Sequence, residues 1–198
     1  MTSNSLTLFD FDGTITKRDS LADFSKYYLG SFEYYKGLLI LSPILLAYKL
    51  KIIPNHVAKE KLTSYFFKGL DSIYFQNIAN TYSIEQIDKI IRPEALERIK
   101  WHQEKGHKTV VVSASMECWL SGWCKKNKLE LIATKLESKN NRLTGKFSTK
   151  NCYGIEKVNR IKEKYNLEDY EVIYAYGDSK GDKEMLSIAD NKFYKHFE

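Results

Sequence analysis

Cysteine, proline and glycine are all scarce in this chain of 198 residues, which contains three, three and ten of them. Cys118, Cys124 and Cys152 form no C-x-x-C pair and are too few for a disulfide framework, so we expect a reducing compartment. The shortage of proline and glycine excludes a low-complexity linker between modules, and the chain has no internal repeat. The length then fits one domain, with or without an insert.

The chain also lacks the motifs of several functional classes. Its four histidines, His56, His102, His107 and His196, do not have zinc-ligand spacing, so we expect structural or surface roles for them. No basic run is interleaved with aromatic residues, which argues against a nucleic-acid partner. The first residues lack the regions of a secretory signal, so we expect a cytoplasmic protein.

Positive charge is in excess, with a net charge of +6 at pH 7. This excess suits an anionic partner such as a phosphorylated substrate, nucleic acid or an acidic lipid surface, and does not choose among them. The hydrophobic fraction of 43% is typical of a folded globular chain and excludes a disordered or integral membrane protein.

Short apolar runs recur along the chain and predict strands that are buried on both faces. They cover residues 5–9, 109–113, 129–134 and 171–176. Helical patterns lie between them, at residues 93–106, 116–128 and 154–166. This alternation predicts an α/β fold, a Rossmann-like three-layer sandwich with a parallel sheet. Turn residues within 137–147 predict a hairpin.

Residues 18–88 interrupt the alternation directly after the first strand. They have helical periodicity and no convincing core strand. We therefore expect an α/β core formed by residues 1–17 and 89–198, and a helical cap insert, residues 18–88, over the carboxyl end of the sheet.

Ligands of open α/β sheets bind outside the carboxyl ends of the strands. The predicted strands bring one set of residues there: Asp10, Asp12, Ser113, Ala114, Lys157, Asp178 and Asp182. Four acids with a lysine and a hydroxyl suit a divalent cation, Mg²⁺, beside a phosphate, and Ala114 leaves its backbone N–H open to the phosphate. Asp10 would attack phosphorus, and Asp12 would transfer protons. Lys157 and Ser113 would hold the phosphoryl oxygens, with Asp178 and Asp182 at the metal.

The motifs "DFDGT", "TVVVS", a lysine about forty residues later and "GDSKGD" resemble, in order, those of the haloacid dehalogenase-like superfamily. The helical insert, with "CYGIEKV" and "GDSKGDKEML", is similar to subfamily IB, the phosphoserine-phosphatase-like branch with a C1-type cap. The resemblance implies a Mg²⁺-dependent phosphatase that forms an aspartyl-phosphate. It also implies that the backbone carbonyl of Asp12 reaches the metal.

The resemblance also bears on the substrate. Phosphoserine phosphatases use an acid shortly after the first motif and a cap arginine; Asp19 stands near the first position, but no arginine lies between Arg18 and Arg92. Phosphoserine is therefore disfavoured. Residues 37–48 are uncharged and mostly apolar, and as a helix they would extend only ~18 Å, against a bilayer core of ~30 Å. They fit either a packed cap helix or a segment dipping into a membrane surface.

This apolar segment resembles that of the phosphatidylglycerophosphatase C branch, whose substrate is a lipid phosphate. A soluble metabolite phosphatase and an aspartyl-phosphate-dependent phosphotransferase stay as alternatives. A phosphorylated signalling domain also uses an aspartate, a lysine and a hydroxyl around Mg²⁺, but it lacks the cap and the second aspartate.

Overall fold

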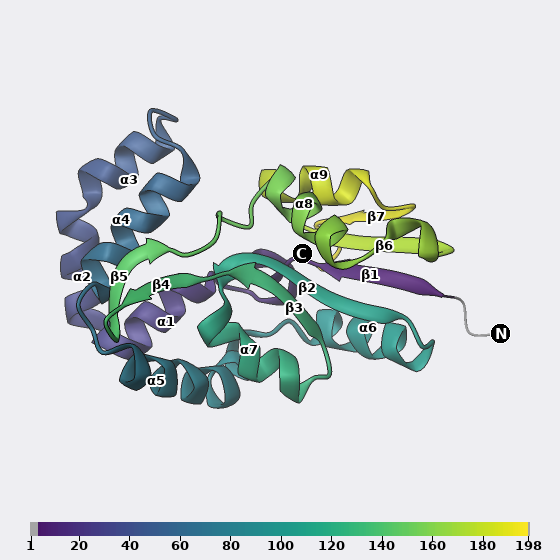
Figure 1. The fold of residues 1–198 in the computed structure, drawn as a ribbon, viewed down its shortest axis with the longest axis horizontal. Helices are drawn as coiled ribbons and strands as arrows, with labels where there is room; N and C mark the ends of the chain where they lie inside the picture. The colour runs from purple at the N-terminus through teal and green to yellow at the C-terminus, as the bar shows by residue number, and fades with distance from the viewer. Residues whose placement is uncertain (1–3, 198) are drawn as a thin grey trace.

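A parallel sheet with strand order β3-β2-β1-β6-β7 forms the centre of the computed structural model, which describes residues 4–197 (Figure 1). The strands are β1 (Ser5–Phe9), β2 (Lys108–Met116), β3 (Glu130–Thr134), β6 (Val172–Gly177) and β7 (Asn191–Tyr194). The four strands predicted from apolar runs are all present. The edge strand β7 was not predicted, because its sequence NKFY is mostly exposed and forms no apolar run.

Helices cover both faces of the sheet. Leu6 and Leu8 of β1 belong to the same hydrophobic cluster as α8 (Ile155–Lys164) and α9 (Lys183–Ser187). Phe9 belongs to a second cluster, with α6 (Pro93–Glu104) and α7 (Glu117–Lys126). Alternate strand residues thus face opposite helical layers, which explains the nearly continuous apolar runs. The predicted three-layer α/β sandwich and its helices α6, α7 and α8 are confirmed.

The segment between β1 and α6 is mainly helical. Its helices are α1 (Ser20–Leu29), α2 (Ser31–Ile40), α3 (Ser42–Lys49), α4 (Asn55–Phe67) and α5 (Ser72–Glu85). In Figure 1 they gather to the left of the sheet. The division of the chain into an α/β core and a cap insert of residues 18–88 stays a prediction.

Aromatic packing joins these helices to the sheet layer. Phe24 of α1 stacks on Trp119 of α7 with a ring separation of 4.7 Å, and it makes edge-on contacts with Phe75 and Tyr82 of α5. The Trp119 indole also donates a hydrogen bond to Ser20 Oγ (3.2 Å). Helices α1 and α5 therefore share one hydrophobic cluster with α7.

The predicted hairpin consists of β4 (Leu136–Lys139) and β5 (Arg142–Phe147), and it lies beside α4 rather than in the main sheet (Figure 1). Leu143 donates a backbone hydrogen bond to Leu70 and accepts one from Gly69. Gly145 allows the close approach, because a Cβ there would lie 2.3 Å from the Cα of Ser64. The hairpin thus contacts the C-terminal part of α4, although in the sequence it lies between the core strands β3 and β6.

The apolar segment 37–48 is two short helices, because α2 ends at Ile40 and α3 starts next to Pro43. Leu41 at the junction is packed, whereas Leu39 is 75% exposed and Leu46 is 56% exposed. In residues 4–197, no helix combines the length and the apolar character needed to span a bilayer.

Candidate active site

The predicted site lies between β1 and β6, at the switch point of the parallel sheet. β1 pairs with β2 on one side and with β6 on the other. The helices α6 and α7, which precede and follow β2, pack on one face of the sheet, whereas α9, which follows β6, packs on the other. Asp10 follows β1 directly, and Asp178 follows β6 directly. All these strands are parallel, so both carboxylates emerge at the same edge, the usual ligand position of such sheets.

Asp10, Asp178 and Asp182 form an acidic cluster. One carboxylate oxygen from each lies within 4.8 Å of those of the other two. Thr14 connects two of them, because its hydroxyl donates to Asp178 Oδ1 (3.1 Å) and Asp10 Oδ2 (3.4 Å). Carboxylate oxygens in this arrangement are the ligands that Mg²⁺ prefers in proteins.

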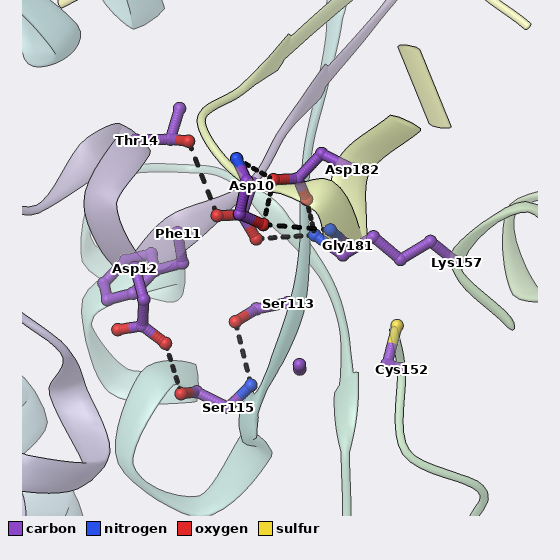
Figure 2. Close-up of polar contacts among 12 residues, drawn as sticks. Asp10, Phe11, Asp12, Thr14, Ser113, Ser115, Cys152, Lys157, Gly181 and Asp182 are labelled. Carbon is purple, nitrogen blue, oxygen red and sulfur yellow. Dashed lines mark hydrogen bonds and ion pairs between the residues drawn. The ribbon is translucent and has the colours of Figure 1, made fainter. Parts of the chain in front are cut away.

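Lys157 is the cation of the site, and only 1% of it is exposed. Its ammonium lies 2.5 Å from Asp10 Oδ1 and 2.6 Å from Asp182 Oδ1, as Figure 2 shows. The lysine is placed there by the first turn of α8. A buried lysine that donates to two carboxylates has a specific position, unlike a solvated helix lysine.

Burial and the shared ammonium set the charges of this group. Burial raises the pKa of Asp10 to about 8, and Lys157 only partly offsets it. Burial also opposes ionisation of Asp182, but Lys157 and hydrogen bonds from Ser179 outweigh it and lower the pKa of Asp182. For Lys157, the two carboxylates outweigh burial and raise its pKa. The raised pKa of Asp10 means that its ionised form is disfavoured beside the other two acids, and a bound cation would offset that cost.

Asp12 turns away from the acidic cluster. Its Oδ2 accepts from the Ser115 hydroxyl, as Figure 2 shows. Its Oδ1 accepts from the backbone N–H of Ser20 (2.7 Å), the first residue of α1. Burial, followed by the charge of Asp19, raises the pKa of Asp12 to about 6, although Lys59 lowers it. A carboxyl group that titrates near neutral pH is suited to proton transfer. Its side chain is outside the acidic cluster.

Ser113 is buried, and its hydroxyl oxygen accepts from the N–H of Ser115 (3.0 Å). β2 does not end at Ser113 but continues to Met116, with an irregular register against β3 over these residues. Ala114 is half-buried, and its carbonyl accepts from Lys59 Nζ (3.0 Å), a contact between α4 of the cap and the end of β2.

A family model described as haloacid dehalogenase-like hydrolase matches residues 7–187, which include every residue of this site. The chain belongs to this family. The hydrolase is 34% identical, over 196 residues, to protein CicA of Caulobacter vibrioides, a match that covers 97% of this chain and 86% of the relative.

Two solved structures are similar to this hydrolase in fold. A protein of unknown function from Bordetella pertussis Tohama I has a TM-score of 0.82 at 20% identity, covering 95% of this chain and 88% of that one. A substrate-bound phosphoserine phosphatase has a TM-score of 0.67 at 21% identity, covering 98% of this chain and 87% of that one.

The candidate substrate residue Asp19 has a structural contact in this hydrolase. It is exposed at the start of α1, and its Oδ1 accepts from the backbone N–H of Ala22 (2.9 Å), so it caps the helix. Its second carboxylate oxygen is not used by that cap.

Three polar residues of the site were missed from the sequence: Thr14, Ser115 and Lys59. A signal existed for Ser115, because residues two apart in a strand share a face, so Ser113 and Ser115 point the same way. Lys59 carried no signal, because it is one of many lysines in a helical stretch whose distance from the first motif does not fix its position.

Proposed function

We propose that this protein is a Mg²⁺-dependent phosphatase that hydrolyses phosphate monoesters through an aspartyl-phosphate intermediate. The observation that carries the proposal is that two neighbouring carboxylates have different surroundings. Asp10 belongs to the acidic cluster with Lys157, whereas Asp12 lies outside it and has a pKa near 6. This arrangement supports a role for Asp10 as the nucleophile and for Asp12 in proton exchange.

Asp10, Asp178 and Asp182 would hold Mg²⁺, together with the backbone carbonyl of Asp12. When bound, the ion would reduce the repulsion between the phosphate dianion and an attacking carboxylate. Lys157 and Ser113, with the N–H of Ala114, would bind the phosphoryl oxygens.

In the first step, a carboxylate oxygen of Asp10 attacks phosphorus, the bond from phosphorus to the ester oxygen breaks, and Asp12 protonates the departing alcohol. In the second step, Asp12 takes a proton from water, which attacks phosphorus and releases Asp10 with inorganic phosphate. Asp12 returns to its protonated form. The two hydrogen bonds that Asp12 accepts, from Ser20 and Ser115, fix its direction between these steps.

For the substrate, we propose a lipid phosphate such as phosphatidylglycerophosphate, bound at a membrane surface. The support is a set of exposed apolar residues on α2, α3 and the turn after α3: Phe32, Tyr35, Leu39, Ile40, Leu46, Leu50 and Ile52. Lys36, Lys49 and Lys51 lie among them in the sequence. Apolar side chains with nearby lysines suit the surface of an anionic bilayer.

The test is phosphate release from a panel of monoesters, with phosphatidylglycerophosphate in mixed micelles beside soluble metabolites. We expect turnover that stops on chelation and returns with Mg²⁺. Asp10→Asn should abolish turnover, because an amide does not attack phosphorus, whereas the exposed control Asp169→Asn should be unaffected. Calorimetry should show weaker Mg²⁺ binding to Asp10→Asn. Full activity of Asp10→Asn would refute the nucleophile assignment.

The same panel separates the alternatives. Preference for a soluble ester over the micellar lipid would establish a metabolite phosphatase. Transfer of phosphate to an added acceptor alcohol, in place of release to water, would establish a phosphotransferase.

A further inference from the structure

A cavity of about 240 Å³ lies inside the cap, between α1, α2, α3 and α4. Its apolar lining includes Leu38, Leu45, Ala58 and Phe66. It is distinct from the exposed apolar residues of α2 and α3, which point outward. A 150 Å³ apolar cavity is enough to hold benzene, so this one has room for roughly ten non-hydrogen atoms.

Two charged residues, Asp19 and Lys59, also line this cap cavity, and the charges of both act on Asp12. Lys59 also donates to the Ala114 carbonyl beside Ser113. Because Asp12 is the proposed proton donor to the leaving alcohol, the cap cavity begins where that alcohol must lie.

Ser25 of α1 supplies an independent observation. It lines the cap cavity and is fully buried, and its hydroxyl has no hydrogen-bond partner. A buried hydroxyl without a partner destabilises the folded state, and a serine in the middle of a helix normally bonds to a backbone carbonyl one turn back. A ligand oxygen inside the cap cavity would satisfy it.

We propose that the cap cavity binds the alcohol part of the phosphate ester and selects an apolar arm of about ten non-hydrogen atoms that carries one oxygen facing Ser25. This inference rests on the proposed phosphatase function. The volume is too small for the two acyl chains of a diacyl lipid, so such chains stay outside the cap cavity. This inference narrows the lipid phosphate of the proposed function to one with a single chain, and the phosphate of a soluble apolar alcohol is the other source of the arm.

The first test is a series of monomeric alkyl phosphates from ethyl to dodecyl. We expect kcat/KM to rise by up to about fourfold per methylene and to level off near ten carbons, because each buried methylene contributes about 0.8 kcal/mol. If kcat/KM rises only at concentrations above the critical micelle concentration, the protein acts on a lipid aggregate. A monomeric rise identifies the arm itself. A flat series would overturn the proposal.

Variants that fill the cap cavity sharpen this test. Ala58→Leu should lower the ratio of octyl to ethyl phosphate kcat/KM by tenfold or more, whereas Lys61→Leu, at an exposed position of the same helix, should not. If Ala58→Leu fails to fold, Ala22→Leu, on the α1 wall of the cap cavity, replaces it. An unchanged ratio in folded filling variants would refute the site.

Ser25→Ala tests the oxygen contact. Replacing one methylene of hexyl phosphate by an ether oxygen, position by position, should give one isostere that the wild type hydrolyses better than Ser25→Ala does, by about two- to tenfold. Equal effects on all isosteres would remove the hydroxyl from the proposal.

Binding of octanol, the product alcohol, gives a readout that does not need turnover. Calorimetry should detect octanol binding to the wild type and its loss in Ala58→Leu. Octanol binding without hydrolysis of any ester would refute the phosphatase proposal and keep the cap cavity as a binding site. Hydrolysis with neither octanol binding nor a chain-length effect would keep the phosphatase proposal and refute the cap cavity as a binding site.

Discussion

Asp10 and Asp12 are separated by one residue, and their carboxylates bind different partners. The Asp10 carboxylate meets Lys157, whereas the Asp12 carboxylate meets Ser20 and Ser115. Gly13 follows directly, with a φ of +86°, and a Cβ there would lie 2.3 Å from Asp178 Oδ2. The glycine in the first motif thus lets Asp178 come close to the chain beside Asp12.

Asp12→Asn should slow hydrolysis of alkyl phosphates by about 10²–10⁴-fold, because an amide neither donates the proton to the leaving alcohol nor takes one from water. An ester with an acidic leaving group, such as p-nitrophenyl phosphate, needs no proton in the first step. Its phosphate-transfer step, measured as a burst of nitrophenol, should therefore be less affected. Equal losses for both kinds of ester in that step would exclude the acid role.

Gly13→Ala should disturb the acidic cluster directly. A Cβ there would lie 2.3 Å from Asp178 Oδ2, in addition to the backbone strain of a positive φ, which costs about 1–3 kcal/mol. Gly69→Ala is the matched control, because Gly69 has a φ of +85° and no atom within 4 Å of the added Cβ. We expect urea unfolding to show a loss of stability in both variants, and calorimetry to show weaker Mg²⁺ binding only in Gly13→Ala. Equal Mg²⁺ affinities would contradict the displacement of Asp178.

At the scale of elements, the sequence predicts what short-range patterns encode. The strands of the core, the helices α6, α7 and α8 and the β4–β5 hairpin all carry a local period or turn signal. The packing of the hairpin on α4 has no such signal, because it depends on a glycine, Gly145, meeting Ser64 across a large sequence distance. Similarly, the sequence gives no signal for Ser25, because a serine within a helical stretch does not indicate that a cavity lies beside it.

The exposed apolar residues of α2 and α3 can be tested separately from the fold. Leu39→Asp combined with Leu46→Asp should weaken binding to anionic liposomes roughly tenfold or more, because both side chains are exposed and available to a bilayer. Activity on a small soluble ester should survive. Ile73→Asp, an exposed apolar position on α5, is the control. The proposed membrane contact is wrong if the wild type does not bind liposomes. It is also wrong if the double variant loses activity on the lipid phosphate and on the soluble ester to the same extent.

At the scale of the whole molecule, the buried His102 joins three elements. Its ring lies 3.1 Å from Thr7 Oγ1 of β1, 3.0 Å from the Tyr176 hydroxyl of β6 and 2.8 Å from His107. Burial, with the charges of His107 and Arg98, lowers the pKa of His102 to about 3. The structural role predicted for this histidine fits its burial.

His102 makes stability dependent on pH. In the unfolded chain a histidine titrates near ~6.5, so below that pH the unfolded state binds a proton that the folded state excludes. The stabilising contribution of the neutral His102 to the free energy of unfolding is therefore complete above pH ~6.5 and falls as the pH decreases toward 3. By pH 5 the loss should be about 2 kcal/mol.

Urea unfolding between pH 7.5 and 5 measures this effect. His102→Gln should remove that part of the slope, whatever its stability at pH 7.5, whereas His56→Gln, at an exposed position, should keep the slope of the wild type. Identical slopes for the wild type and His102→Gln would contradict the assignment.

The position of β1 in the sheet has a consequence for how the chain folds. β1 is the middle strand, and its neighbours are far away in sequence: Leu6 pairs with Lys108 on one side and with Ile173 on the other. During synthesis, β1 therefore leaves the ribosome long before either partner exists, and its apolar residues have no sheet to join. The helices of the insert form from local contacts in the meantime, whereas the sheet must wait for loops of about one hundred residues or more to close. The acidic cluster, which needs Asp10, Asp178 and Asp182 together, is consequently among the last parts of the molecule to assemble.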